Sequence, residues 1–187
     1  MTTPTADDAK AEADFRFPQV HRYPAFYTRQ TNLTTHHAQL LKWSALVLAY
    51  ARHHRLFKLQ LSAAAESDLF YNRKIDRRLA MPDIRELVDF MRKEGQAEYA
   101  TPGSTDVVYV YWRTPAEWAA AVEAYVDGTG SKGSVLTVYE LTDGEGTRGT
   151  ELHGMDSEVL LKALNILVKK GKAQIFGQDD SLGVKFF

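Results

Sequence analysis

A long helical pattern of apolar residues begins after Asn32. Apolar side chains recur at spacings of three and four in two parallel rows, and this is the spacing of one helix face. The rows are Leu40, Trp43, Val47 and Tyr50, and Leu41, Ala45 and Leu48. Because the two rows together make the middle of the pattern apolar nearly all round, we expect a buried central helix.

Shorter elements follow this helix. FKLQLS alternates, with Phe57, Leu59 and Leu61 on one side, and predicts a strand. The charged stretch SDLFYNRKIDRRLA is expected to be a short helical region with a turn. The next helix starts around Pro82, since proline fits a first helical turn, and ends at Gly95, a typical stop. Strands are predicted at QAEYA and DVVYVYW, joined by TPGST, which has turn chemistry.

The second half of the chain repeats this plan. A helix is predicted from the capping residue Asp156 to Gly171, followed by the strands KAQIFG and LGVKFF around the turn QDDS. Aligning Gly95 with Gly171 superimposes the apolar stripes of the two helices. The aligned pairs are Ile84 with Leu160, Leu87 with Ala163, Val88 with Leu164, and Met91 with Leu167. Two copies alone indicate tandem domains rather than a solenoid.

The order of elements in each half is helices first and a two-stranded hairpin last. This is the order of a winged helix, a helix-turn-helix core with a β wing. We therefore predict an α+β fold with two tandem winged-helix domains, residues 32–113 and 114–187. Thr114 can cap the helix that Pro115 begins, which places the boundary there.

Three stretches stand outside these elements. Residues 1–14 are polar and acidic, without the apolar core of a secretory signal, and are expected to be a disordered tail. VLTVYELTDG is ambiguous between helix and strand, and DGEGTRG is expected to be a flexible insertion.

Residues 15–31 combine two prolines with many aromatic side chains. Pro18 and Pro24 fix their own φ angles and hold Phe17 and Tyr23 in extended geometry, so we expect an extended segment with its aromatic rings splayed out. Together the rings can cover on the order of 800 Å², about one side of a standard interface. The segment either folds over its own domain or docks into a groove on another protein.

Charge argues against nucleic-acid binding. The net charge is -1, which provides no general attraction for phosphates. The would-be recognition helices are near neutral: Arg85, Arg92 and Lys93 stand against Asp83, Glu86, Asp89 and Glu94, and Lys162, Lys169 and Lys170 stand against Asp156 and Glu158. The best basic cluster is Arg73, Lys74, Arg77 and Arg78, interpreted as a solvated helix face; contact with an acidic partner or lipid headgroups stays open. A winged-helix nucleic-acid-binding protein remains the alternative function.

Candidate catalytic chemistry is absent from the sequence. There is no cysteine, hence no disulfide or thiolate, and no phosphate-binding glycine motif. The histidine pairs His36/His37 and His53/His54 lie too far apart to share a metal; the six histidines are interpreted as surface or helix-boundary residues. The longest apolar run, Ala45 to Ala51, cannot span a bilayer. We expect a soluble, cytoplasmic protein with no catalytic residue, cofactor or metal.

Several blocks of sequence also resemble a known family. FRFPQVHRYPAFYTRQTN, QLLKWSALVLAYAR, DLFYNRKIDRRL, YVYWRTPAEWA, VLTVYELTDGE, ELHGMD and GVKFF are similar, in order, to blocks of the vacuolar protein-sorting-associated protein 25 family, the small subunits of the ESCRT-II endosomal sorting complex. The resemblance covers nearly the whole chain after the tail.

The resemblance implies a function without catalysis. In that family, two copies of the small subunit join one copy each of two larger ESCRT-II subunits, and the second winged helix recruits an ESCRT-III subunit. The complex sorts ubiquitinated cargo into multivesicular bodies. The chain would then be cytoplasmic and recruited to the endosomal membrane, with membrane contact only through the complex and no nucleic-acid partner.

The resemblance also assigns a partner-binding site. In the family the proline-aromatic segment plugs into hydrophobic pockets on the larger subunits, and the matching residues here are Pro18, Tyr23, Pro24, Phe26 and Tyr27. The family often shows two adjacent prolines before paired aromatics. Here Ala25 stands in place of the second proline, which leaves more chain entropy to lose on docking. No motif transfers for the ESCRT-III contact.

Overall fold

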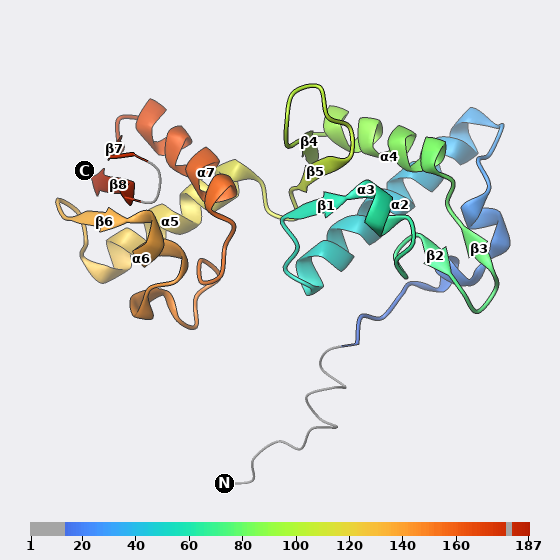
Figure 1. Ribbon diagram of the computed structural model, residues 1–187, viewed down its shortest axis with the longest axis horizontal. Coiled ribbons are helices and arrows are strands. Elements are labelled where there is room, and N and C mark those ends of the chain that lie inside the picture. Colours follow the sequence, from blue (N-terminus) through green and yellow to red (C-terminus); the bar gives the residue numbers. More distant parts are fainter. Residues whose placement is uncertain (1–13, 179–180) are drawn as a thin grey trace, which may run out of the picture. The chain divides into compact units, whose positions relative to one another are not determined.

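The chain is described here by a computed structural model that covers residues 14–178 and 181–187. The predicted disordered tail, residues 1–14, lies outside the described residues except for Asp14. The structure divides into two compact units, one ending at Trp112 and the other beginning at Arg113 (Figure 1).

The first unit has the element order of a winged helix. Its elements are α2 (Leu33–His53), β1 (Lys58–Gln60), α3 (Leu61–Ala64), α4 (Met81–Lys93), β4 (Ala97–Tyr99) and β5 (Val107–Val110). The three strands form an antiparallel sheet in the order β1-β5-β4, with Leu59 and Tyr99 both opposite Val108. Asn32 caps α2 through a side-chain oxygen that accepts from the Thr35 amide, which explains where the helix starts.

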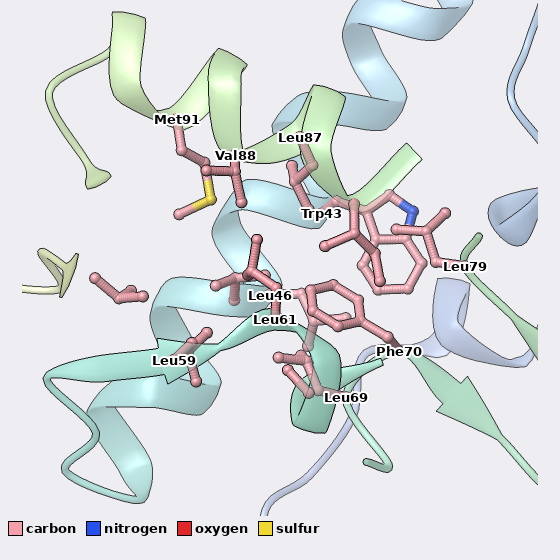
Figure 2. Close-up of a cluster of buried hydrophobic side chains, with 14 of the residues drawn as sticks. Trp43, Leu46, Leu59, Leu61, Leu69, Phe70, Leu79, Leu87, Val88 and Met91 are labelled. Carbon is pink, nitrogen blue, oxygen red and sulfur yellow. The ribbon is translucent and has the colours of Figure 1, made fainter. Parts of the chain in front are cut away.

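The core of the first unit lies between α2, α4 and this sheet. Figure 2 shows Trp43 and Leu46 of α2 facing Leu87 and Val88 of α4, with Leu59 of β1 on the side of the sheet. All five side chains are buried. Burial of a large apolar side chain contributes about 1.5–3 kcal/mol, so this cluster is the main source of stability for the unit.

The helix α2 is not buried all round. Trp43 and Val47 of the first predicted row are buried, as expected, but Leu41 is 50% exposed and Ala45 is exposed. The prediction of a buried helix is therefore wrong for Leu41 and Ala45, whereas Leu48 of the same row is partly buried against the core. The reason is that α4 and the sheet cover only one side of α2, and between residues 14 and 112 no element covers the side that carries Leu41.

The basic stretch after α3 is a hairpin rather than a helix. β2 (Tyr71–Asn72) pairs with β3 (Arg77–Arg78), with Tyr71 opposite Arg78. Buried side chains fix both ends: Phe70 precedes β2, Leu79 follows β3, and the Leu79 amide donates to the Phe70 carbonyl at 2.8 Å. These anchors bring the two ends together, and the prediction of a helical region is wrong.

The second unit repeats the order of the first. Its elements are α5 (Pro115–Thr129), β6 (Val135–Thr137), α6 (Val138–Thr142), η3 (Glu145–Thr147), α7 (Ser157–Lys169), β7 (Ala173–Phe176) and β8 (Gly183–Phe186). The strands form an antiparallel sheet in the order β6-β8-β7. Thr114 and Glu117 form a reciprocal capping box at the start of α5.

Two stretches of the second unit that the sequence does not assign to a helix or strand have definite structure. VLTVYELTDG is first strand and then helix, because Thr137 ends β6 and caps α6 in a capping box with Glu140. DGEGTRG, predicted to be a flexible insertion, instead contains the 3₁₀ turn η3. Thr147 fixes this turn, since it is fully buried and its hydroxyl donates to the Gly144 carbonyl at 2.9 Å.

The predicted repeat between α4 and α7 is confirmed. All eight aligned stripe residues are buried. Gly95 and Gly171 both have φ of 71°, a left-handed conformation that favours glycine. After each glycine, the next amide donates back to the last stripe residue: Gln96 to Met91 at 2.8 Å and Lys172 to Leu167 at 2.9 Å, a Schellman closure.

Candidate partner-binding segment

The proline-aromatic segment, residues 15–31, contains two 3₁₀ turns, η1 (Gln19–Arg22) and η2 (Pro24–Tyr27). The expectation of an extended segment is therefore wrong over these turns. Proline has a φ angle that also suits the start of a helical turn: Pro18 caps η1 and Pro24 is the first residue of η2. Tyr23 between them is extended (φ −95°, ψ 124°), as expected before a proline.

The helix α2 holds the backbone of this segment. The Gln39 side-chain amide donates to the carbonyls of Phe26 at 2.8 Å and Thr28 at 2.9 Å. The indole nitrogen of Trp43 donates to the same Phe26 carbonyl at 2.9 Å. A buried hydrogen bond of this kind contributes about 0.5–1.5 kcal/mol, so the three together fix η2 on its own domain.

Two of the five predicted partner-binding side chains point into the domain. Phe26 is 5% exposed and stacks on Trp43 with ring centroids 4.1 Å apart and planes 5° apart. Tyr27 is also buried, and its hydroxyl donates to the His21 carbonyl at 2.9 Å. Burial raises the pKa of Tyr27 to about 12. Both rings belong to the core in this structure, contrary to the expectation that the aromatics splay out.

The other three predicted side chains face solvent. Pro18 and Pro24 are exposed, and Tyr23 is 52% exposed. The side-chain amide of Gln19 donates to the Tyr23 hydroxyl at 3.2 Å. Two neighbouring turns on a fixed backbone thus present an exposed surface made of Pro18, Tyr23 and Pro24, which we call the segment tip.

An ionic cluster fixes the end of the segment that leads into α2. The Arg29 guanidinium donates to both carboxylate oxygens of Glu86, at 2.8 and 3.1 Å, and the His36 Nε2 atom lies 2.8 Å from one of them. These contacts, led by the hydrogen bond from Arg29, lower the pKa of Glu86 to about 2. The cluster joins the segment, α2 and α4.

Sequence reasoning missed two buried histidines. His21 and His36 are interpreted above as surface or helix-boundary residues, but both are buried. The His21 Nε2 atom lies 3.2 Å from the Leu69 carbonyl, and the Asn72 amide donates to the His21 carbonyl at 2.8 Å. Burial lowers the pKa of His21. Its position inside an aromatic run was the available signal for a packed ring.

The second unit also has an exposed apolar surface, on the outer face of its sheet. Val135 of β6 and Phe176 of β7 are 50% and 45% exposed. Gly183 of β8 lies between them: a Cβ atom there would stand 3.0 Å from the Phe176 ring and 3.3 Å from Val135. The missing side chain lets the Phe176 ring cross β8 toward Val135. We call these three residues the wing patch.

The basic cluster lies on the β2–β3 hairpin, not on a helix face, with the Arg73 and Arg78 guanidinium groups over the Tyr71 ring at 4.7 and 4.3 Å. Within residues 14–178 and 181–187, no three His, Asp or Glu side chains group as metal ligands. None of the helices in that part of the chain has the length and apolar character needed to cross a membrane.

Comparison with known proteins identifies the family. A family model described as ESCRT-II complex subunit matches residues 20–156. Vacuolar protein-sorting-associated protein 25 of Xenopus laevis is 38% identical over 173 residues, which cover 92% of this chain and 99% of that protein. The Homo sapiens protein of the same name is also 38% identical, over 92% of this chain and 98% of its own. The Dictyostelium discoideum protein is 32% identical.

Solved structures agree in fold. The crystal structure of subunit VPS25 of the endosomal trafficking complex ESCRT-II matches with a TM-score of 0.81 and 24% identity, and the match covers 91% of this chain and 98% of that one. A chain of the endosomal complex ESCRT-II (VPS22/VPS25/VPS36) matches with a TM-score of 0.80. With its tandem winged-helix fold and its relatives over nearly their full length, the chain belongs to the family of ESCRT-II complex subunits and is similar to vacuolar protein-sorting-associated protein 25.

Proposed function

We propose that the chain is a non-catalytic subunit that joins two larger ESCRT-II subunits through its proline-aromatic segment. The support is twofold. The similar proteins span nearly the whole chain, and a solved structure of one of them is of an assembly with two other subunits, VPS22 and VPS36. We place the contact at the segment tip because Tyr23 is 52% exposed there on a backbone that α2 fixes.

The five segment residues then divide into two roles. Pro18, Tyr23 and Pro24 contact the larger subunits directly, while Phe26 and Tyr27 hold the tip in position from inside the core. Preorganisation favours such an arrangement, because a fixed tip loses little conformational freedom on binding. Hydrogen bonds also restrict the backbone at Ala25, where the family often has a second proline. The Gln30 side chain donates to the Ala25 carbonyl at 3.2 Å, and Gln39 and Trp43 donate to the carbonyl of the next residue, Phe26.

The test is co-purification of the tagged full-length chain with the two larger subunits, and measurement of the mass of the complex. The variant Tyr23→Ala/Pro24→Ala removes most of the tip without touching the core. Loss of two contacts at about 1 kcal/mol or more each is expected to weaken assembly at least about 30-fold. The complex of the unchanged chain is expected to hold two copies of it.

The matched control is Tyr139→Ala/Pro102→Ala, which removes the same residue types from exposed positions elsewhere. It is expected to assemble normally. Circular dichroism of both variants tests whether they keep the fold. If the Tyr23→Ala/Pro24→Ala chain assembles as tightly as the control, the segment tip is not the contact.

We further propose that the second unit recruits an ESCRT-III subunit by binding its N-terminal helix, as the family resemblance implies. The wing patch supports this location, because Val135 and Phe176 expose apolar surface that an amphipathic helix would bury. Val135→Glu/Phe176→Glu is expected to abolish binding of that helix. Leu33→Glu/Leu41→Glu, which changes two exposed apolar residues of the first unit, is the control that should bind normally.

In the cell, these contacts would place the chain in the sorting of ubiquitinated cargo into multivesicular bodies. The chain would act in the cytosol and reach the endosomal membrane as part of the complex. The Val135→Glu/Phe176→Glu chain separates the two steps: it should still join the larger subunits but fail to recruit the ESCRT-III subunit. A chain that fails at both would place both contacts on one surface and overturn this division.

A further inference from the structure

The first unit contains a groove that the segment tip does not use. It has a volume of about 600 Å³ and runs between the start of the proline-aromatic segment and the β2–β3 hairpin. Its lining includes the aromatic residues Phe15, Phe17 and Tyr71 and the cations Arg16, Arg22 and Lys74. Tyr23 and Pro24 do not line it. A volume of this size lies in the range of ligand-binding sites.

The floor of the groove is aromatic and rigid. The Phe15 and Phe17 rings meet edge to face with centroids 5.0 Å apart, and Phe17 stacks on the buried His21 at 4.2 Å. Phe15 also contacts Tyr50 edge to face at 5.4 Å. Phe15, Phe17 and Tyr71 are half-buried. Phe15 and Phe17 therefore each keep part of the ring exposed at a position where neighbouring rings already restrict its rotation.

The rim of the groove is positively charged. Arg16, Arg22, Arg73 and Lys74 line it, and none forms an ion pair with another described residue. The Arg73 side chain donates to the backbone carbonyl of Glu66 and lies over Tyr71, so its charge is not neutralised. The one carboxylate in the lining is Asp68, which already accepts the Tyr50 hydroxyl at 2.7 Å.

Four cations against one carboxylate are unusual for a chain whose net charge is -1. Like charges that lie close together repel one another, and this cost is offset when an anionic ligand neutralises them. A bare phosphate or lipid headgroup would use the cations and leave the aromatic floor uncovered. A peptide with acidic residues on both sides of an apolar side chain would use the floor and the rim together.

We propose that this groove binds an acidic linear peptide whose apolar or aromatic side chain lies on the Phe15–Phe17 floor. The carboxylates on either side of that side chain pair with Arg16 and Lys74. Such a site is distinct from the segment tip and from the wing patch, and it gives the first unit a partner of its own. The peptide can belong to a further protein or to a distant part of a protein already in the complex.

The test is a fluorescence anisotropy titration of the full-length chain with the fluorescein-labelled peptide EEDFEEWEDE. Saturable binding that weakens as salt is raised is expected. Arg16→Glu/Lys74→Glu reverses two rim charges and is expected to weaken binding about tenfold or more, since each exposed pair contributes up to about 1 kcal/mol. Replacing both aromatic residues of the peptide with serine is expected to weaken binding by a similar factor.

The matched control is Lys42→Glu/Lys93→Glu, which makes the same change in net charge at exposed positions outside the groove. It is expected to bind the peptide within twofold of the unchanged chain, and thermal unfolding checks that both variants fold. Equal weakening in both variants would reduce the interaction to general charge attraction and overturn the proposal. Equal binding of the serine peptide would show that the floor is unused, with the same result.

A second experiment tests whether lipid headgroups, rather than an acidic peptide, supply the anionic groups that bind in the groove. The same chains are sedimented with phosphatidylcholine vesicles that contain phosphatidylserine and phosphatidylinositol phosphate. Suppose that the vesicles bind the unchanged chain but not the Arg16→Glu/Lys74→Glu chain, and that no peptide binding is seen. The groove is then a membrane-binding site and the peptide proposal is wrong. Peptide binding without vesicle binding supports it.

Discussion

Glu86 shows how one residue can fix an element that lies far away in sequence. Glu86 belongs to α4. Its carboxylate accepts hydrogen bonds from Arg29 of the proline-aromatic segment and contacts His36 of α2. No sequence pattern pairs these residues, because Arg29 and Glu86 are 57 positions apart. The sequence could therefore predict an aromatic segment, but not the ionic cluster that ties it down.

This cluster makes the stability of the first unit depend on pH. The pKa of Glu86 falls from 4.5 to about 2 on folding, so its stabilising effect is complete above about pH 4.5 and is lost as pH falls toward 2. Glu86→Gln is expected to cost about 1 kcal/mol near pH 6, because the carboxylate is partly exposed and screened by solvent. The difference from the unchanged chain should shrink near pH 3.

Urea unfolding curves at the two pH values measure this effect. Glu66→Gln is the control, because Glu66 pairs with the exposed Arg78 on the hairpin, and exposed pairs contribute little. Its urea midpoint near pH 6 should match that of the unchanged chain. A Glu86→Gln difference that stays constant or grows between pH 6 and pH 3 would mean that the carboxylate is not the linked group.

At the scale of elements, the sequence predicts the helices α4 and α7 better than it predicts short strands and turns. The stripes of α4 and α7 and their glycine stops follow from sequence, because each spans several helical turns. The β2–β3 hairpin has only two residues in each strand, too few for alternation to appear. Likewise, Pro18 and Pro24 fit both an extended segment and a 3₁₀ turn. At η2, the hydrogen bonds from Gln39 and Trp43 decide for the turn.

The same contacts explain why the candidate site was only partly predictable. Composition correctly marks residues 15–31 as aromatic and unusual, but it does not tell which side of the backbone meets α2. Phe26 and Tyr27 pack against the Trp43 ring in the core. The tight turn of η2 leaves Tyr23 and Pro24 exposed to solvent. The tip is thus determined by tertiary packing rather than by the local sequence.

The repeated glycine stops give a prediction at this scale. Gly95→Ala and Gly171→Ala are each expected to destabilise their own unit by about 1 kcal/mol, because a φ of 71° strains any L side chain although nothing lies within 4 Å of the added Cβ. Gly128→Ala is the matched control. Gly128 lies inside α5, also has open space, and has no positive φ, so alanine should stabilise by about 0.5–1 kcal/mol.

Chemical denaturation of the three variants measures the change. The opposite signs matter, since the substitution is the same in every case and only the backbone conformation differs. A Gly95→Ala chain as stable as the unchanged chain would mean that α4 can end without a left-handed residue. The Schellman bond from Gln96 to Met91 would then contribute little to the helix end.

At the scale of the whole molecule, each unit buries a core of its own. Leu87 of α4 and Leu164 of α7 are almost completely buried, each among residues of its own unit. We therefore predict that the two units unfold separately. Leu87→Ala and Leu164→Ala are each expected to cost about 2–5 kcal/mol, and hydrogen exchange of individual peptides reports where that cost appears.

The two leucine variants serve as controls for each other. Leu87→Ala should speed amide exchange in α2 and α4 and leave α5 and α7 at the rate of the unchanged chain, and Leu164→Ala should do the reverse. Under the proposed function, in which each half contacts a different partner, one half could then tolerate strain without loss of the other contact. If either variant speeds exchange equally in both halves, the units fold as one cooperative structure, and a defect in the wing patch would also weaken the segment tip.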